Sequence, residues 1–124
     1  MGSIRSHKDL KVYQASFSAA AEIFDLSVSF PSDEKYSLTD QIRRSSRSVS
    51  ANLAEAFRKR RYEKAFVAKL TDAEGEAAET QVWLDFSLQH QYTSPKTHDL
   101  LYEKYEIILN QILSMINSSG KWGY

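Results

Sequence analysis

The spacing of apolar residues is the sequence feature that most restricts what this chain can fold into. Around and between Pro31 and Pro95, apolar residues recur at intervals of three and four, which is the period of a helix. No segment shows the alternation that a strand would need. The sequence therefore predicts an all-α protein.

Four helical segments are predicted, at about residues 8–29, 37–57, 62–90 and 94–117. Ser37, with Asp40 three residues later, is a candidate N-cap for the second helix, and Ser94 followed by Pro95 for the fourth. Gly75 inside the third helix suggests a close backbone approach. The predicted core faces are Leu10, Tyr13, Phe17, Ala20 and Phe24; Leu38, Ile42, Ser45, Val49, Asn52 and Ala56; Tyr62, Phe66, Leu70, Ala73, Ala77, Thr80, Leu84 and Leu88; and Leu101, Tyr105, Ile108, Ile112 and Met115.

The lengths of these segments favour an antiparallel bundle. Helices of this size are roughly 30 to 43 Å long, and short connections place consecutive helices side by side. At 124 residues the chain has the length of one domain. We therefore predict an up-down-up-down four-helix bundle over residues 7–118, with a disordered tail or expression remnant at 1–6 and a C-terminal tail at 119–124.

Further apolar residues lie beside the predicted core faces of the third and fourth helices. One explanation is a broad core-facing sector. The other is a subunit interface, because monomers rarely expose large continuous apolar patches. We expect self-association through these residues, which are Val67, Val82, Trp83, Phe86, Leu100, Ile107, Leu109, Leu113 and Ile116.

Positive charge is concentrated near the end of the second helix. The chain has 16 Lys and Arg and 16 Asp and Glu, yet eight of the cations fall between residues 43 and 64. Such a run either complements the negative end of the helix dipole or contacts a polyanion, RNA or DNA. Arg suits phosphate better than Lys, which favours phosphate contacts from Arg43, Arg44, Arg47, Arg58, Lys59, Arg60, Arg61 and Lys64.

A line of polar residues follows the edge of the second helix's core face. One interpretation is a buried hydrogen-bond network that sets the register between helices. The alternative is a catalytic carboxylate pair, but the sequence offers no arrangement of nucleophile and base to support it. We expect a structural role for Ser45, Ser48, Asn52 and Glu55, with Glu79 and Thr80 on the third helix as partners.

Other chemistry has little support in the sequence. His7, His90 and His98 lie on separate segments without the spacing of metal ligands, and there is no cysteine. No Gly-rich phosphate loop is present, and no run approaches the roughly 18 apolar residues of a membrane span. We predict a cytoplasmic, non-enzymatic protein with no metal and no cofactor.

One pattern in the second helix resembles a known family. It is formed by Leu38, Gln41, Ile42, Arg43, Arg44, Ser48, Val49, Asn52, Leu53, Ala54 and Glu55. With the segments DLKVYQAS, FPSDEKYSL and AEGEAAETQ, the chain resembles, over about residues 7–118, a four-helix-bundle family encoded in intervening sequences of bacterial large-subunit rRNA genes and labelled as ribosomal proteins. The chain departs from the family pattern at Ala56, where glycine is usual, and at Glu76, where serine is usual.

The resemblance implies more than the fold. The family includes the accessory variability determinant of diversity-generating retroelements, a homopentamer of four-helix bundles with a basic, nucleic-acid-binding surface that works with a reverse transcriptase. By resemblance, we expect a homopentamer that binds RNA or DNA, with a reverse transcriptase as a further candidate partner. The competing interpretations are a protein scaffold whose basic stretch is only solvated and an enzyme built on the polar line.

Overall fold

The computed structural model describes residues 4–123, all in helices and the turns between them. No strand occurs within these residues, which confirms the all-α prediction. In chain order the elements are η1 (His7–Asp9), α1 (Lys11–Ser27), η2 (Ser32–Glu34), α2 (Leu38–Arg58), α3 (Glu63–Gln89), α4 (Pro95–Asn117) and η3 (Ser119–Lys121).

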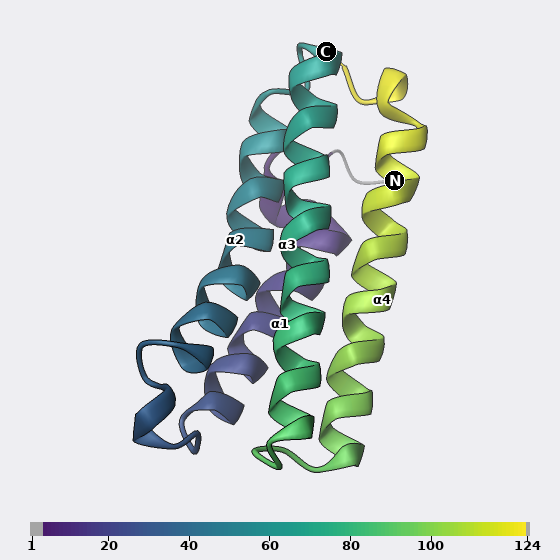
Figure 1. Ribbon diagram of the computed structural model, residues 1–124. Helices are drawn as coiled ribbons and strands as arrows, with labels where there is room; N and C mark the ends of the chain where they lie inside the picture. Colours follow the sequence, from purple (N-terminus) through teal and green to yellow (C-terminus); the bar gives the residue numbers. More distant parts are fainter. Residues whose placement is uncertain (1–3, 124) are drawn as a thin grey trace.

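The four long helices form the predicted up-down-up-down bundle. Figure 1 shows α3 between α2 and α4, with α1 behind them. α1 packs against α2 and α4, and α3 packs against the same two helices from the other side. This topology brings the α2–α3 connection to the same end of the bundle as the C-terminus of α4 (Figure 1).

The core faces of α2, α3 and α4 largely match the prediction. Tyr105 of α4 and Phe66 of α3 are fully buried in the core, as are Leu53 and Phe57 of α2. Asn52 and Leu88 are only half-buried. Tyr62, predicted at the start of the α3 face, is instead 65% exposed because it precedes the helix as its N-cap residue.

The predicted core face of α1 is only partly right: Leu10 is buried and Tyr13 packs against the core, but Phe17 and Phe24 do not lie in it. Phe17 is 60% exposed and Phe24 is 41% exposed. The buried side chains of α1 are small or aliphatic, and Ser16 shares a hydrogen bond of 2.8 Å with Ser50 of α2. These side chains face α2 and the core, so Phe17 and Phe24, at other positions around α1, lie at the surface. The buried α1 residues are Val12, Ser16, Ala19, Ile23 and Ser27.

One of the two predicted helix caps is present. Ser94 accepts a hydrogen bond from the backbone N–H of Thr97, as expected for an N-cap before Pro95. Ser37 does not cap α2, because its hydroxyl donates to the Glu34 carboxylate at 2.7 Å. Glu34 itself accepts a 3.4 Å hydrogen bond from the Leu38 N–H, so the first turn of α2 is capped from η2.

Gly75 does not mark a close backbone approach. It is exposed on α3, and no atom beyond its own helix backbone and chain neighbours lies within 4 Å of where a Cβ would stand. The expectation was wrong because this glycine faces away from the core. Its effect is therefore only the loss of helix propensity.

Short 3₁₀ helices lie at both ends of the described bundle, η1 before α1 and η3 after α4. Residues 1–3 and 124, which belong to the two predicted tails, lie outside the described residues. Ser6 caps η1, and the Trp122 ring lies 6.2 Å from the Phe66 ring, centre to centre. None of the described helices is both long enough and apolar enough to cross a membrane.

Candidate nucleic-acid interface

The α2–α3 connection is built almost entirely from cations and one aromatic residue. Arg58 ends α2, residues 59–62 form the turn, and Lys64 lies in the first turn of α3. The Tyr62 N–H donates to the Lys59 carbonyl at 2.9 Å, and this hydrogen bond closes the turn. The sequence thus places five of the eight predicted phosphate contacts at one tip of the bundle.

Three of these cations are exposed and form no ion pair with the described residues, although Glu63, whose carboxylate accepts a 2.7 Å hydrogen bond from Ser119, directly precedes Lys64. Within residues 4–123, no carboxylate oxygen lies within 4.0 Å of the side-chain nitrogens of Arg58, Lys59 or Lys64. All three side chains are exposed. They are therefore open to a polyanion.

Arg60 has a different environment from its neighbours. Its guanidinium lies 3.8 Å from the centre of the Phe57 ring and donates a 2.7 Å hydrogen bond to the Phe57 carbonyl. This contact satisfies a carbonyl that the end of α2 leaves without a helical partner. Arg60 therefore stabilises the end of α2 whatever else it binds.

Arg44 lies on the side of the bundle, in an ion-pair cluster with α3. Its guanidinium donates two hydrogen bonds to Glu76, of 3.1 and 3.2 Å, and also contacts the Glu79 carboxylate. Partial burial alone would raise the pKa of Glu76, but hydrogen bonds from Arg44 and Ser48 outweigh it and hold that pKa below its ordinary value. Two carboxylates beside Arg44 make this position unfavourable for phosphate.

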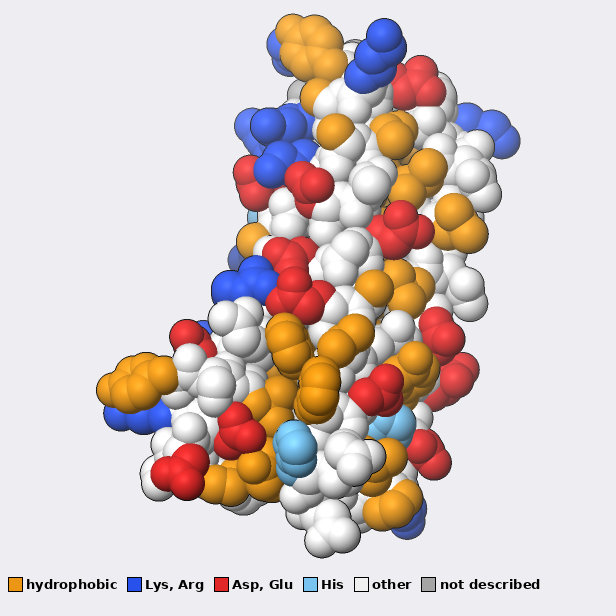
Figure 2. Space-filling model, viewed as in Figure 1, with side chains coloured by type: hydrophobic (Ala, Val, Ile, Leu, Met, Phe, Trp, Pro, Cys, Tyr) orange, Lys and Arg blue, Asp and Glu red, His pale blue; other side chains and the backbone are white. Residues whose placement is uncertain are grey.

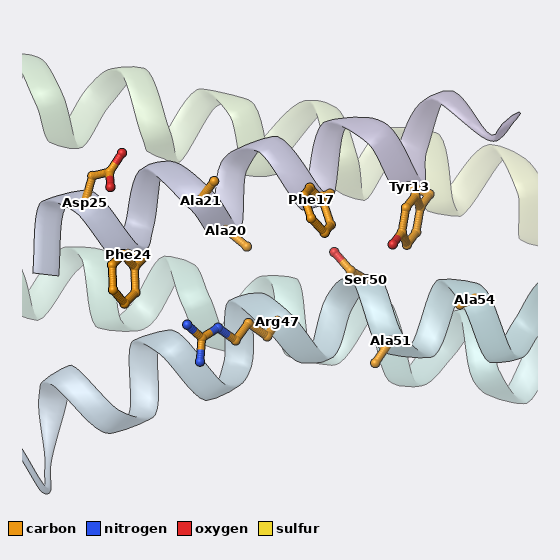
Figure 3. Close-up of a pocket in the computed structure, with 10 residues that line it drawn as sticks. All are labelled: Tyr13, Phe17, Ala20, Ala21, Phe24, Asp25, Arg47, Ser50, Ala51 and Ala54. Atoms are coloured by element: carbon orange, nitrogen blue, oxygen red, sulfur yellow. The ribbon is translucent and has the colours of Figure 1, made fainter. Parts of the chain in front are cut away.

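Arg43 and Arg47 lie on the α1 side of α2, along a groove between the two helices. Their guanidinium carbons lie 4.4 and 5.7 Å from the centre of the Phe24 ring. Figure 3 shows Arg47 directed towards Phe24 across this groove. The groove is mostly apolar, and its lining residues are Tyr13, Phe17, Ala20, Ala21, Phe24, Asp25, Arg47, Ser50, Ala51 and Ala54.

The eight predicted phosphate contacts therefore fall into three separate places. Arg58, Lys59, Arg60, Arg61 and Lys64 share the α2–α3 connection. Arg44 faces α3, and Arg43 and Arg47 face α1. Only the first group forms a concentrated basic surface.

The polar line is mostly engaged in hydrogen bonds between α2 and α3. Ser45 and Thr80 share a buried hydrogen bond of 2.8 Å, and Ser48 donates to Glu76 at 2.9 Å. The Asn52 amide donates back to the Ser48 carbonyl at 2.9 Å within α2.

The two predicted glutamates of this line also have partners. Glu55 lies 3.5 Å from the Lys69 ammonium, and Glu79 accepts a 3.1 Å hydrogen bond from the indole of Trp83. The residue that sequence reasoning did not place in the network is Glu76, which binds both Arg44 and Ser48. Its side chain falls between Arg44 and Ser48 only in the observed register of α2 against α3.

Charge is divided between the two halves of the bundle. The dividing level is the contact between Ser48 and Glu76. The half that contains the α2–α3 connection, made of residues 4–17, 49–75 and 107–123, has ten Lys and Arg and five Asp and Glu. The other half, residues 18–48 and 76–106, has six and eleven. Figure 2 shows this division on one face, with Lys and Arg mostly towards the upper end and Asp and Glu mostly from the middle downward.

We call residues 4–17, 49–75 and 107–123 the basic half. It joins the connection to cations from other elements, namely Arg5, Lys8 and Lys11 near the start of α1 and Lys121 in η3. Within residues 4–123, no three His, Cys, Asp or Glu side chains are grouped so that they could hold a metal ion. The α2–α3 connection, with four consecutive cations at residues 58–61, is therefore the candidate binding feature of the basic half.

Comparison with known proteins identifies relatives of this bundle. Residues 8–117 match the model of a family described as 23S rRNA-intervening sequence protein. A crystal structure of a protein of unknown function from the S23 ribosomal protein family of Bacteroides thetaiotaomicron superposes with a TM-score of 0.77. It is 27% identical in sequence, and the match covers 86% of this chain and 95% of that one. No curated protein matches the sequence.

Proposed function

We propose that this chain, which belongs to the family of 23S rRNA-intervening sequence proteins, binds nucleic acid through its basic half as a non-enzymatic cytoplasmic oligomer. The observation that carries the proposal is the α2–α3 connection, where Arg58, Lys59 and Lys64 are exposed and form no ion pair within the described residues. Cations of such a surface would displace the counterions bound to nucleic-acid phosphates and release them into solvent.

The helix dipole explains only part of this charge. Arg58 and Lys59 stand at the C-terminus of α2, where cations are favourable. Lys64 and Lys11 stand in the first turns of α3 and α1, where the dipole disfavours a positive charge. Because the same half of the bundle gathers cations at both kinds of helix end, a polyanionic ligand accounts for the charge better than dipole compensation does.

Self-association is the second part of the proposal. Phe17 of α1 and Phe86 of α3 are 60% and 46% exposed, and they belong to different apolar surfaces. Figure 2 shows hydrophobic side chains gathered over α3 and towards α4, whereas the Phe17 surface borders the α1–α2 groove of Figure 3. Two different surfaces on one chain allow a head-to-tail interface, which closes into a ring when the rotation permits.

The family resemblance extends this proposal to particular partners. It supports a homopentamer as the ring and, for the retroelement branch of the family, a reverse transcriptase as a protein partner. The exposed apolar side chains also favour a second candidate function, a protein scaffold without nucleic-acid binding. The two functions differ in whether the basic half contributes affinity for a polyanion.

A salt-dependent binding measurement distinguishes them. A mixed-sequence RNA and its DNA equivalent would be titrated by fluorescence anisotropy at low and high salt, with wild type and with Arg58, Lys59 and Lys64 changed to Gln. We expect affinity to fall steeply with salt, and each lost phosphate contact to reduce the slope of log affinity against log salt by roughly 0.7 to 0.9.

The matched control changes three cations of the other half, Lys35, Lys96 and Lys104, to Gln. This variant has the same net charge as the first, so it separates local contacts from the effect of total charge. We expect it to bind almost as wild type does. Salt-insensitive binding, or no binding, would reject the nucleic-acid function and favour the scaffold.

A further inference from the structure

The α2–α3 connection also carries an exposed aromatic ring among its cations. Tyr62 is 65% exposed and lies between Arg61 and Glu63, with Lys64 next along the chain. No other aromatic ring of residues 4–123 packs against it. The ring is therefore available to a ligand in the part of the surface where phosphate would be held.

The backbone that carries this ring is anchored on both sides. The Tyr62 N–H is bonded to the Lys59 carbonyl, and the Tyr62 carbonyl accepts the N–H of Phe66, each at 2.9 Å. Phe66 is fully buried in the core. Because the turn is anchored on both sides of Tyr62, a molecule that stacks on the ring would not have to order the backbone first.

We propose that this surface binds single-stranded nucleic acid, with the Tyr62 ring stacked on an unpaired base and Arg58, Lys59 and Lys64 holding the adjacent phosphates. The inference rests on the proposed function and specifies which form of nucleic acid that site recognises. Cations that follow the backbone beside an aromatic platform are the usual means of binding a single strand.

The shape of the surface argues against a duplex as the ligand. The cations lie on a short turn at the tip of the bundle, which offers no projecting helix or ribbon to enter a major groove. In a duplex the base faces are covered by their neighbours, so the Tyr62 ring would find no stacking partner except at a duplex end. In a single strand each base has an accessible face.

The chain contains a matched control for the ring. Tyr36 is 83% exposed and lies beside Lys35, whose ammonium is 5.3 Å from the ring centre. It lies outside the basic half, in the part of the bundle with more acidic than basic residues, and Asp33 and Glu34 are close to it in the sequence. Tyr36 has the same exposed side chain and a neighbouring cation, but it lacks the concentrated positive surface.

The test compares a single-stranded RNA of about 16 nucleotides with the duplex formed with its complement. Wild type, Tyr62→Ala, Tyr62→Phe and Tyr36→Ala would be titrated at one salt concentration, and circular dichroism would check that each variant is folded. We expect wild type to bind the single strand more tightly than the duplex. Tyr62→Ala should lose about fivefold to a hundredfold in affinity for the single strand, whereas Tyr62→Phe and Tyr36→Ala should bind as wild type does.

The outcomes separate this inference from the proposed function. Equal affinity for the single strand and the duplex would overturn the single-strand inference, and so would wild-type affinity in Tyr62→Ala. The proposed nucleic-acid binding would still stand in either case if binding depended on salt. Absence of salt-dependent binding to either RNA would overturn both. An equal loss in Tyr36→Ala would show that the effect does not belong to the α2–α3 connection, and would also overturn the inference.

Discussion

Ser45 of α2 and Thr80 of α3 share a hydrogen bond of 2.8 Å at a point in the core that solvent does not reach. The Thr80 hydroxyl also donates to the Glu76 carbonyl at 2.9 Å. The Ser45 hydroxyl has a longer contact of 3.4 Å with the Ile42 carbonyl. Because each hydroxyl has one hydrogen, these distances favour Thr80 as donor within α3 and Ser45 as donor between the helices. With the contacts of Glu76 to Ser48 and Arg44, this buried hydrogen bond helps to fix how far α2 lies along α3.

Removing either hydroxyl should destabilise the fold. Ser45→Ala leaves an acceptor of Thr80 without a donor, and Thr80→Val leaves the Ser45 hydroxyl without its best acceptor. We expect each variant to lower the free energy of unfolding by about 1 to 3 kcal/mol, and the double variant to lose less than the sum. Urea unfolding of the four proteins in this cycle measures the coupling; strictly additive losses would show that the pair does not act as a unit.

Glu76 should make the stability of the bundle depend on pH in the acid range. Its pKa is lowered in the folded state, so its stabilising effect is present above the ordinary value of 4.5 and is lost as pH falls through the folded pKa. We expect wild type to be more stable than Glu76→Gln near neutral pH, and the difference to shrink below about pH 4.5. Urea unfolding over this range measures it, with exposed Glu103→Gln as the control. A difference that does not change with pH would contradict the assignment.

His98 should have the opposite pH dependence. It is buried between Asp85 of α3 and Asp99 of α4, with ring-nitrogen distances of 2.8 and 2.9 Å. Burial alone would lower its pKa, but the hydrogen bonds to the two carboxylates outweigh burial and raise the pKa above 6.5. Its contribution is therefore complete below about pH 6.5 and is lost as pH rises through the folded value.

An NMR titration measures the His98 pKa directly. We expect a value above 6.5 in wild type and a lower one in Asp85→Asn, which removes one carboxylate. The free energy of unfolding of wild type relative to His98→Asn should decrease as pH rises above this value. A wild-type pKa at or below 6.5 would contradict the contacts seen between α3 and α4.

Gly75 offers a test in which only backbone propensity changes. A Cβ at this exposed helical position meets no atom within 4 Å, so alanine adds no clash. We expect Gly75→Ala to raise the free energy of unfolding by about 1 kcal/mol and the melting temperature by about 3 to 6 °C. Ala78→Gly, at an exposed position one turn later, should lower both by a similar amount. Destabilisation by Gly75→Ala would contradict the open environment seen at this position.

For α3 and α4, the sequence correctly predicted features that lie within a single helix, such as a buried face or an N-cap. The buried faces of α3 and α4 follow directly from apolar residues three and four apart, as at Leu101, Tyr105 and Ile108. The Ser94 cap was predictable for the same reason, because its signal lies within four consecutive residues. Neither conclusion needs information about a neighbouring helix.

The features that the sequence did not reveal depend on how two helices meet. α1 has two stripes with helical spacing, and only the small residues of α2, such as Ser50, decide that Ser16 faces inward and Phe17 outward. The pairing of Arg44 with Glu76 likewise requires the register of α2 against α3. The cation cluster of the α2–α3 connection was predictable because residues 58–61 are consecutive in the chain. The pairing of Arg44 with carboxylates of α3, away from that cluster, was not predictable from the sequence.

The exposed phenylalanines test whether association is head-to-tail. We expect wild type to sediment as an oligomer, because Phe17 and Phe86 would each be covered by a different surface of a neighbouring chain. Phe17→Glu and Phe86→Glu should each sediment as monomers, since a charge in an apolar interface is unfavourable. Both side chains are exposed in the single chain, so the variants should fold.

A mixture of the two variants distinguishes the possible symmetries. In a head-to-tail interface, Phe17→Glu keeps the Phe86 surface intact and Phe86→Glu keeps the Phe17 surface intact, so the mixture should form a heterodimer that cannot close into a ring. If one of these surfaces instead paired with itself in a two-fold dimer, the variant in that surface would be monomeric and the other variant would still sediment as a dimer. Sedimentation velocity of each variant and of the mixture therefore decides between a ring and a two-fold dimer, and wild type that remains monomeric at all concentrations would reject both.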